Sequence, residues 1–344
     1  MDDHATKRDW AYCREMLQKV SRTFALNITQ LHGDIFKAVL LGYLLFRIAD
    51  TFEDNLYQGE EEKIADLEDF SEIFRGNKDL HRRVRLYESL KFRWNENSFE
   101  KDLIENGSAV LRCYFDISET YRRIIDPLLV KTSEGMAKFQ RRKLESKSTI
   151  FQLADVKELE DYCYYVAGVV GVMLTKVFCE KQSIREKRSE LERFEVHFGL
   201  ALQLINIIKD YEKDMARGWF YIPVTVTENY NIELDKIDTL SMDQRQGIVQ
   251  ELIPRVVRYL DSTLKYIRLL PLHETSIRRF CILPFVIGYR TLAKVVQVEG
   301  NKISREEVAS IVNKTALYAQ SNRALEEDYL EIRGRYFIAG GGAL

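Results

Sequence analysis

A short acidic motif, Asp50-Thr-Phe-Glu53-Asp54, holds side chains whose type and spacing could do chemistry. Asp50 and Asp54 are four residues apart, so on an α-helix both carboxylates project from one face. Two like charges stacked in this way repel each other, and a divalent cation would offset the repulsion. Magnesium is a natural candidate because it takes hard oxygen ligands and is often shared between carboxylates and substrate phosphates.

Residues upstream of this motif sharpen the expectation. Together with Asp50 and Asp54, Tyr43 and Arg47 complete a stripe at i, i+4, i+7 and i+11 along one helix face. The other positions between 40 and 46 are mostly leucine or phenylalanine. We therefore expect the arginine and the two aspartates to line a cavity rather than to decorate a surface.

A second motif repeats the arrangement at the end of another apolar segment. Asn206, Asp210 and Asp214 are spaced at i, i+4 and i+8, again on one helix face. Basic side chains next to such a motif could meet phosphate oxygens. The neighbours that could contact a substrate here are Gln203, Lys209 and Arg217.

Either motif alone is also what an exposed, charged helix end looks like, because i,i+4 charge pairs are common on helix surfaces. Two copies favour a functional site, and antiparallel helices could bring them face to face across a cleft. Diphosphate is a poor leaving group until its charge is neutralised, and bridging Mg²⁺ ions act as Lewis acids and templates. The predicted chemistry is Mg²⁺-dependent ionisation of an allylic prenyl diphosphate, with an apolar cavity that shields the cation from water.

The segments that must position these motifs are predicted to be helical. Apolar residues recur at three- and four-residue spacing, as in 188–211, and alternating two-residue patterns are scarce, so we expect an all-α protein. The clearest break is 218–236, and neither a linker nor an internal repeat divides the chain. The expected helices span about 6–30, 34–54, 59–75, 81–94, 99–124, 126–145, 155–180, 184–214, 242–269, 273–298 and 303–332.

The composition is that of an ordinary globular protein. The chain has 344 residues, 46% of them hydrophobic, and a net charge of −2 gives no reason to expect nucleic acid as a partner. No apolar run reaches the ~20 residues of a membrane span. The polar start and the tail carry no recognisable signal or anchor, so we expect a cytoplasmic protein without a transmembrane segment.

The cysteines are scattered without close pairs, so neither a disulfide framework nor a zinc site is expected. Reduced cysteines packed as small apolar residues fit a cytosolic protein. The five are Cys13, Cys113, Cys163, Cys179 and Cys281.

Five segments resemble the squalene/phytoene synthase family, in the family's order and at close to its spacing. Two of them, SRTFAL and YCYYVAG, look especially like squalene synthases. The resemblance implies that residues 1–344 form a single-domain helical bundle of the class I isoprenoid (terpenoid) synthase type, with a central cavity. The segments are Val20-SRTFAL-Asn27, Tyr43-LLFRIADTFED-Asn55, Asp161-YCYYVAGVVG-Val172, Leu202-QLINIIKDYEKD-Met215 and Phe280-CILP-Phe285.

The resemblance also implies a reaction. Such enzymes join two farnesyl or two geranylgeranyl diphosphates head to head: one loses diphosphate, and the other's double bond attacks the allylic cation. Proton loss gives a cyclopropylcarbinyl diphosphate, which is ionised again and rearranged. In squalene synthases a hydride from NADPH then quenches the cation. The implied activity is a farnesyltransferase that uses Mg²⁺ and NADPH to make squalene through presqualene diphosphate.

Individual residues take roles from the same resemblance. Tyr162 matches a tyrosine implicated in proton transfer, although on an apolar helix it could also be a packed core residue. A free tyrosine titrates near pH ~10, so this role needs a perturbed pKa or a diphosphate as the acceptor. The magnesium–diphosphate positions are matched by Asp50, Glu53, Asp54, Asn206, Asp210 and Asp214. The diphosphate contacts are matched by Ser21, Arg22, Arg47 and Lys209, and the pocket positions by Phe24, Tyr43, Gln203 and Phe280.

The sequence departs from the family's pattern near the quenching step. The family usually has an arginine five residues after the last aspartate of the second motif; Trp219 stands there, and Arg217 is the nearest arginine. Of the basic residues linked to NADPH, Lys302 aligns with one, while Ser304 stands close to where another would be. No Gly-rich dinucleotide fingerprint supports NADPH independently.

Other outcomes stay open. The condensation could end in dehydrosqualene, phytoene, hydroxysqualene or presqualene diphosphate, and a terpene cyclase would instead cyclise one prenyl diphosphate. A non-enzymatic assembly factor is disfavoured, because such relatives have lost the acidic motifs that are intact here. The expected partners are a prenyl diphosphate, a membrane touched peripherally during product release as one option, and at most a weak dimer of this chain.

Overall fold

The computed structural model describes residues 5–76, 78–90, 98–232, 234, 240–297 and 303–337, without the side chain of Arg22. The chain divides into two compact units. Unit 1 consists of Met1–Lys147 and Val172–Lys181, and unit 2 consists of Ser148–Gly171 and Gln182–Leu344. Each unit is therefore assembled from segments that are far apart in the sequence.

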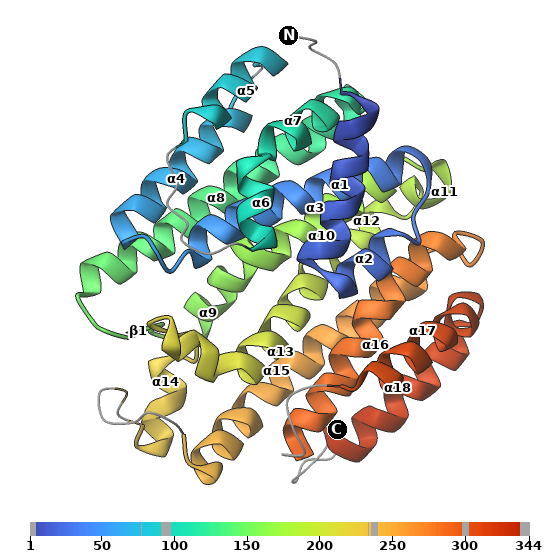
Figure 1. Ribbon diagram of the computed structural model, residues 1–344. Helices are drawn as coiled ribbons and strands as arrows, with labels where there is room; N and C mark the ends of the chain where they lie inside the picture. The colour runs from blue at the N-terminus through green and yellow to red at the C-terminus, as the bar shows by residue number, and fades with distance from the viewer. Residues whose placement is uncertain are drawn as a thin grey trace. The chain divides into compact units, whose positions relative to one another are not determined.

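Helices build unit 1, and α3 is the helix around which the others pack (Figure 1). It contacts α1, α4, α6, α7 and α8, which explains why it is apolar on nearly every side. The elements are α1 (Lys7–Val20), α2 (Arg22–Ile28), α3 (Gly33–Asp54), α4 (Glu60–Phe74), α5 (Leu80–Glu88), α6 (Phe99–Glu105), α7 (Gly107–Asp116), α8 (Glu119–Ser146) and the second part of α10 (Val169–Phe178).

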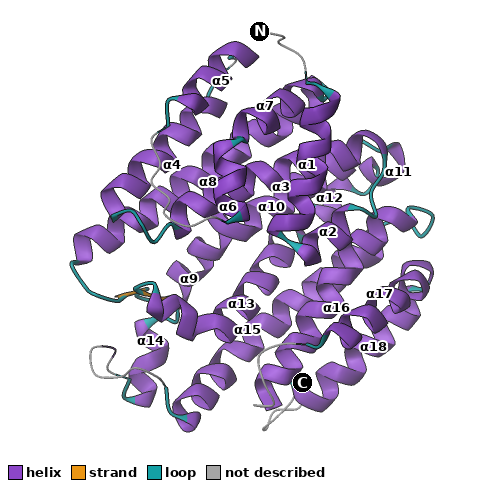
Figure 2. Cartoon of the chain, in the orientation of Figure 1, coloured by secondary structure: helices purple, strands orange, loops and turns teal. Residues whose placement is uncertain are grey.

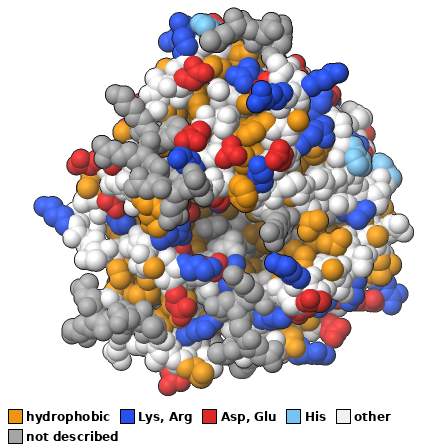
Figure 3. Space-filling view, viewed as in Figure 1, with side chains coloured by type: hydrophobic (Ala, Val, Ile, Leu, Met, Phe, Trp, Pro, Cys, Tyr) orange, Lys and Arg blue, Asp and Glu red, His pale blue; other side chains and the backbone are white. Residues whose placement is uncertain are grey.

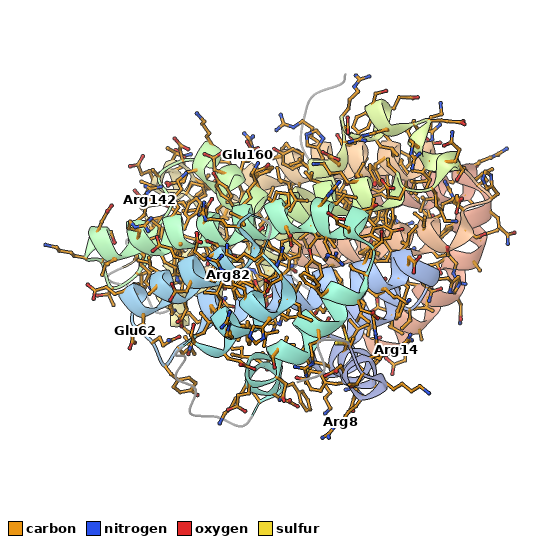
Figure 4. All side chains as sticks on the ribbon, turned by 90° about the horizontal axis from the view of Figure 1, so that it is seen from above. Arg8, Arg14, Glu62, Arg82, Arg142 and Glu160 are labelled. Atoms are coloured by element: carbon orange, nitrogen blue, oxygen red, sulfur yellow. The ribbon has the colours of Figure 1, made fainter. Side chains whose placement is uncertain are left out.

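The outer helices of unit 1 are amphipathic. On α1, Arg8 and Arg14 are exposed and point away from the ribbon (Figure 4), whereas Cys13 and Leu17 are buried. In the interior, Gly42 of α3 allows α10 to approach closely, because a Cβ at this position would lie 2.9 Å from the sulfur of Met173. The apolar run before the first acidic motif is thus the core of unit 1.

Unit 2 is also helical, with α13 packed against α15 and α16. Figure 2 shows one small pair of strands among its helices. The elements are β1 (Phe151–Gln152), α9 (Val156–Cys163), the π-helix η1 (Tyr164–Gly168), the first part of α10, α11 (Gln182–Arg185), α12 (Arg188–Leu191), α13 (Glu195–Ala216), β2 (Trp219–Phe220), α14 (Val224–Thr227), the 3-10 turn η2 (Glu228–Tyr230), α15 (Met242–Leu269), α16 (Thr275–Gln297), α17 (Arg305–Gln320) and α18 (Asn322–Tyr336).

The two strands pair in parallel, with Phe151 opposite Trp219 and Gln152 opposite Phe220. The Phe151 amide donates to the carbonyl of Gly218 at 3.0 Å. This pairing connects the segment before α9 with the segment after α13. It therefore fixes the residues that follow the second acidic motif against the helix that carries Tyr162.

The π-helix η1 lies directly against α13. A Cβ on Gly171 would come within 2.0 Å of the Glu195 carbonyl oxygen, and one on Gly199 within 2.2 Å of the Ala167 carbonyl oxygen. Glycine is therefore required for these two backbones to meet. Single π-turns inside helices are frequently found at functional sites, and this one follows Tyr162 by two residues.

The prediction of an all-α protein is confirmed. Four predicted helices, at 34–54, 59–75, 242–269 and 273–298, agree with α3, α4, α15 and α16 to within two residues at each end. All five cysteines are buried and free of disulfides, as expected. The predicted break at 218–236 contains β2, α14 and η2, but residues 233 and 235–239 lie outside the described part.

Several segments that were predicted as single helices are divided into shorter helices in the structure. The predicted helix 6–30 is two helices that meet at Ser21, and 303–332 is two helices that meet at Ser321. Each serine accepts a hydrogen bond at 3.2 Å from a backbone N–H in the helix that follows. This is the N-cap interaction by which a serine begins a new helix, and it ends the preceding one.

Other boundaries differ as well. The predicted helices 99–124 and 126–145 are instead α6, α7 and α8, and α8 runs through the predicted boundary and through Pro127. Proline removes one backbone hydrogen bond from a helix interior, and the long packing of α8 against α4 outweighs that loss. The predicted helix 184–214 is divided into α11, α12 and α13, and 155–180 is interrupted by the π-turn.

One helix, α16, is long and apolar enough to cross a membrane by length and composition. Of its most apolar window, 67% is buried inside the structure. A helix that is apolar on all sides is what a protein core requires, so packing accounts for this composition. On the face seen in Figure 3, charged side chains of both signs are scattered among the apolar ones.

Candidate active site

The first acidic motif forms the end of α3. Asp50, Glu53 and Asp54 occupy its last turns, with Glu53 only 4% exposed and Asp54 exposed. Negative charge at a helix C-terminus is opposed by the helix dipole. The motif therefore needs nearby cations, and the surrounding helices of unit 1 supply them.

Arg47 lies one turn before Asp50 on α3. Its Nη1 donates to Asp50 Oδ2 at 2.7 Å, and its Nη2 donates to Glu100 Oε1 at 3.1 Å. Arg47 is therefore at the first motif, as the helical stripe predicted. Glu100, on α6, was not identified from the sequence.

Two lysines approach the same end of α3. Lys143 of α8 pairs with Glu60 of α4, with 2.9 Å between Nζ and Oε1. Lys63 is only 5% exposed. Burial and then the charge of Lys143 lower its pKa below the ordinary value, while Glu60 and the two acids of the motif, Asp54 and Glu53, act in the opposite direction. Neither Lys63 nor Lys143 lies in a recognisable motif, so the sequence alone did not indicate that they are near the acidic residues.

Three other predicted residues gather beside Arg47. The rings of Phe24 and Tyr43 have centroids 5.3 Å apart, and Phe24 is 44% exposed. Burial raises the pKa of Tyr43, and a hydrogen bond with Ser21 acts to lower it. The structure thus brings Ser21, Phe24 and Tyr43 together beside Arg47. The side chain of Arg22 lies outside the described part of the chain.

The second motif lies on α13, which is not regular there. Asp210 has φ −110° and ψ 15°, so the helix is kinked at the central aspartate and the predicted continuous stripe is interrupted. Asp210 contacts two lysines, at 2.9 Å from Lys209 Nζ and 2.6 Å from Lys213 Nζ. Burial acts to raise the pKa of Asp210, but the hydrogen bonds from Lys213 and Lys209 outweigh it and hold the pKa below its ordinary value.

The remaining members of this motif also have basic partners. Asp214 is buried, and its Oδ1 accepts from Arg217 Nη2 at 2.5 Å. Asn206 Oδ1 accepts from Lys209 Nζ at 3.1 Å. Lys209 and Arg217, both predicted to contact diphosphate, therefore lie at the motif with their charges directed to its oxygens.

Tyr162 is buried at the end of α9, and its hydroxyl donates to Tyr221 Oη at 2.9 Å. The two rings are stacked with centroids 4.4 Å apart. Trp219 stacks on Tyr221 at 5.2 Å. Trp219 and Tyr221 are two residues apart in an extended segment, so they share a face. That spacing was a readable signal for Tyr221, which the sequence interpretation missed.

Of the other predicted residues, Gln203 is half-buried on α13 and Phe280 is buried on α16. These two helices pack closely, since a Cβ on Gly288 would lie 2.9 Å from Leu202. Lys302, predicted to bind NADPH, lies outside the described residues. Ser304 is the N-cap of α17 and accepts from the Glu307 amide at 3.2 Å.

The donor set of both motifs fits magnesium. Among the residues that the structure describes, no three His, Cys, Asp or Glu side chains form a cluster that could hold a metal ion. Each motif instead offers hard carboxylate oxygens, and the hydrogen bonds from the neighbouring lysines lower the pKa of Asp210, which favours its charged form. Such a set suits Mg²⁺, which usually binds one or two carboxylates together with substrate phosphates rather than an all-protein cage.

The fold has close counterparts among solved structures. The complex of TcSQS with the ligand BPH1237 superimposes with a TM-score of 0.79 at 23% identity, covering 97% of this chain and 94% of that one. A dehydrosqualene synthase in complex with a ligand gives a TM-score of 0.64 at 20% identity, covering 91% of this chain and 96% of that one. The chain therefore has the all-α fold of the isoprenoid synthases.

Sequence comparison identifies the family. The squalene/phytoene synthase profile matches residues 17–311, and the chain belongs to that family, whose members include prenyltransferases. Squalene synthase 1 of Arabidopsis thaliana is 28% identical over 90% of this chain and 72% of its own length. The squalene synthase of Schizosaccharomyces pombe is 26% identical over 86% of this chain, which spans only 61% of that protein. Squalene synthase 2 of Panax ginseng is 28% identical over 83% of this chain, which spans 63% of that protein.

Proposed function

We propose that this protein is a Mg²⁺-dependent prenyltransferase that condenses two prenyl diphosphates head to head. The observation that carries the proposal is that both acidic motifs are intact and each aspartate pair lies against basic side chains. Mg²⁺, when bound, neutralises the leaving diphosphate. At the first motif, Asp50 and Asp54 on α3 would hold a metal ion, with Glu53 as a further oxygen donor. At the second motif, Asp210 and Asp214 on α13 would do the same, with Asn206 as the further donor.

The basic residues of the motifs would bind the diphosphate itself. Arg47, Lys209 and Arg217 each contact a carboxylate of their own motif in the structure. If the carboxylates held a metal ion, these N–H donors would be available to phosphate oxygens, with which they would form strong charge-assisted hydrogen bonds. The same cations would thus pair with the carboxylates before substrate binds and with the diphosphate afterwards.

The hydrogen bond from Tyr162 to Tyr221 supports a role for Tyr162 in proton transfer. A neutral tyrosine can accept a proton at Oη only while it passes its own proton on. Tyr221 Oη, 2.9 Å away, would take that proton while giving up its own, and a released diphosphate would be the final acceptor. The stack of Tyr162, Tyr221 and Trp219 also excludes water from a cation.

Tyr162→Phe is therefore expected to slow formation of the cyclopropylcarbinyl diphosphate by about 10²-fold. The ring and its stacking remain, and only the hydroxyl is lost. Single turnover of farnesyl diphosphate with product quantification measures this step. Tyr165→Phe, three residues further on in η1, is the matched control and should keep the wild-type rate. A wild-type rate for Tyr162→Phe in an active preparation would remove its role.

For the substrate and ending, we propose two farnesyl diphosphates, NADPH as reductant and squalene as product. The relatives named squalene synthase support this choice. An ending without reduction is the second candidate, because Ser304 serves as a helix cap and adds no charge beside the predicted NADPH contact. An apolar product and the largely buried α16 fit a cytoplasmic, single-domain enzyme that touches membranes only peripherally.

Product analysis separates these endings. Incubation with farnesyl or geranylgeranyl diphosphate, Mg²⁺, and either NADPH or none should yield squalene from farnesyl diphosphate only when NADPH is present. Chelation of Mg²⁺ should stop diphosphate release in every case. The same hydrocarbon with and without NADPH would exclude the reductive ending, and no diphosphate release from either substrate would contradict the proposed activity.

A further inference from the structure

Arg47 is held by carboxylates from two different helices of unit 1. Asp50 lies three residues further along α3, and Glu100 lies in the first turn of α6. The guanidinium uses one terminal nitrogen for each carboxylate, at 2.7 Å and 3.1 Å. Arg47 therefore bridges the first acidic motif to a helix that carries no other predicted site residue.

The bridge is partly shielded from water. The side chains of Arg47 and Glu100 are 29% and 30% exposed. An arginine guanidinium is charged at any physiological pH, so both of these hydrogen bonds join charged groups. Charge-assisted hydrogen bonds in such surroundings are stronger than the ion pairs of an open surface.

Substrate binding is expected to affect Asp50 and Glu100 differently. Asp50 is a predicted metal ligand, so binding of Mg²⁺ and diphosphate would draw it away from Arg47. Glu100 is outside the motif and would keep its bond. Resting on the proposed function, we propose that Glu100 is a positioning residue that holds Arg47 beside the first motif, so that Nη1 is directed at diphosphate when Asp50 binds the metal.

A second ion pair on α6 provides a matched comparison. Lys101 and Glu105 are 3.6 Å apart at i,i+4, and the Glu105 side chain is half exposed. Exposed pairs of this kind contribute little to stability. Glu105→Gln therefore removes the same charge from the same helix without touching Arg47.

The test is calorimetric titration of the full chain with inorganic diphosphate in the presence of Mg²⁺. Glu100→Gln is expected to weaken binding about tenfold, which corresponds to about 1.4 kcal/mol, while Glu105→Gln leaves it unchanged. Glu100→Asp, which keeps the charge but shortens the reach, should fall between. In an Arg47→Gln background, Glu100→Gln should have little further effect, because the residue acts through Arg47.

The outcomes separate the two proposals. If the wild-type chain neither binds diphosphate with Mg²⁺ nor releases it from a prenyl diphosphate, the proposed function fails. If the wild type binds and Glu100→Gln binds equally well, the role of Glu100 is overturned. An equal loss with and without Arg47 also overturns it. If Glu100→Gln does not fold, as judged by circular dichroism, Glu100→Asp decides: undiminished affinity rejects the role.

Discussion

Asp210→Asn is expected to lower Mg²⁺-dependent release of diphosphate at least about 10³-fold, or about 4 kcal/mol of transition-state stabilisation. The substitution keeps the shape of the side chain and removes its charge. Asp210 is the aspartate of the second motif that contacts both Lys209 and Lys213. Its loss would remove a proposed oxygen ligand for Mg²⁺ and the carboxylate that both lysines contact, so both contributions to neutralising the leaving group would weaken.

The measurement is diphosphate release from farnesyl diphosphate, with helical content followed by circular dichroism. Glu212→Gln is the matched control, because it removes one exposed carboxylate from between the two aspartates and should leave the rate within about twofold. Asp50→Asn should reproduce the large loss from the first motif. Full activity of either aspartate variant would show that the metal assignment to that motif is wrong.

The second large effect concerns stability. Arg278 of α16 is fully buried, and all of its hydrogen bonds go to oxygens of neutral groups. Burial lowers the pKa of this guanidinium below its ordinary value. The positive charge of Arg278 is not paired with a carboxylate among these partners. It lies at the C-terminal ends of α15 and α17, where a helix leaves carbonyls without intrahelical partners and carries partial negative charge. The acceptors are the carbonyl oxygens of Ile267, Leu270, Tyr318 and Ala319 and Oδ1 of Asn322.

Arg278→Met is expected to lower the free energy of unfolding by at least about 3 kcal/mol, because several buried carbonyls lose their donor at about 1–3 kcal/mol each. Urea unfolding followed by circular dichroism measures the change. Arg268→Met, at the exposed end of α15, removes a surface pair with Glu326 and should cost less than about 1 kcal/mol. Equal midpoints for the two variants would show that the buried hydrogen bonds add nothing to stability.

Local sequence patterns were reliable where a helix packs on the core. The apolar spacing predicted the bounds of α3 and α15 to within one residue. A helix that packs on the core must present at least one apolar face, and that face is visible in the sequence. The breaks at Ser21 and Ser321 were readable as N-caps but were passed over in favour of long apolar patterns. The π-turn after Tyr162 was not readable, because it depends on how closely α13 and η1 approach. The kink at Asp210 was not readable either, because no proline or glycine lies beside it in the sequence.

In the candidate site, too, some residues could be identified from the sequence and others only from the structure. The sequence by itself determined the two aspartate pairs and the arginine or lysine beside each, because residues three or four apart on a helix are necessarily neighbours. It also determined the family. Only the tertiary structure decided that Glu100 holds Arg47, that Lys63 approaches the first motif and that Tyr221 receives the hydrogen bond of Tyr162. These partners come from other helices or strands, and their meeting depends on the packing of whole elements, which local spacing does not encode.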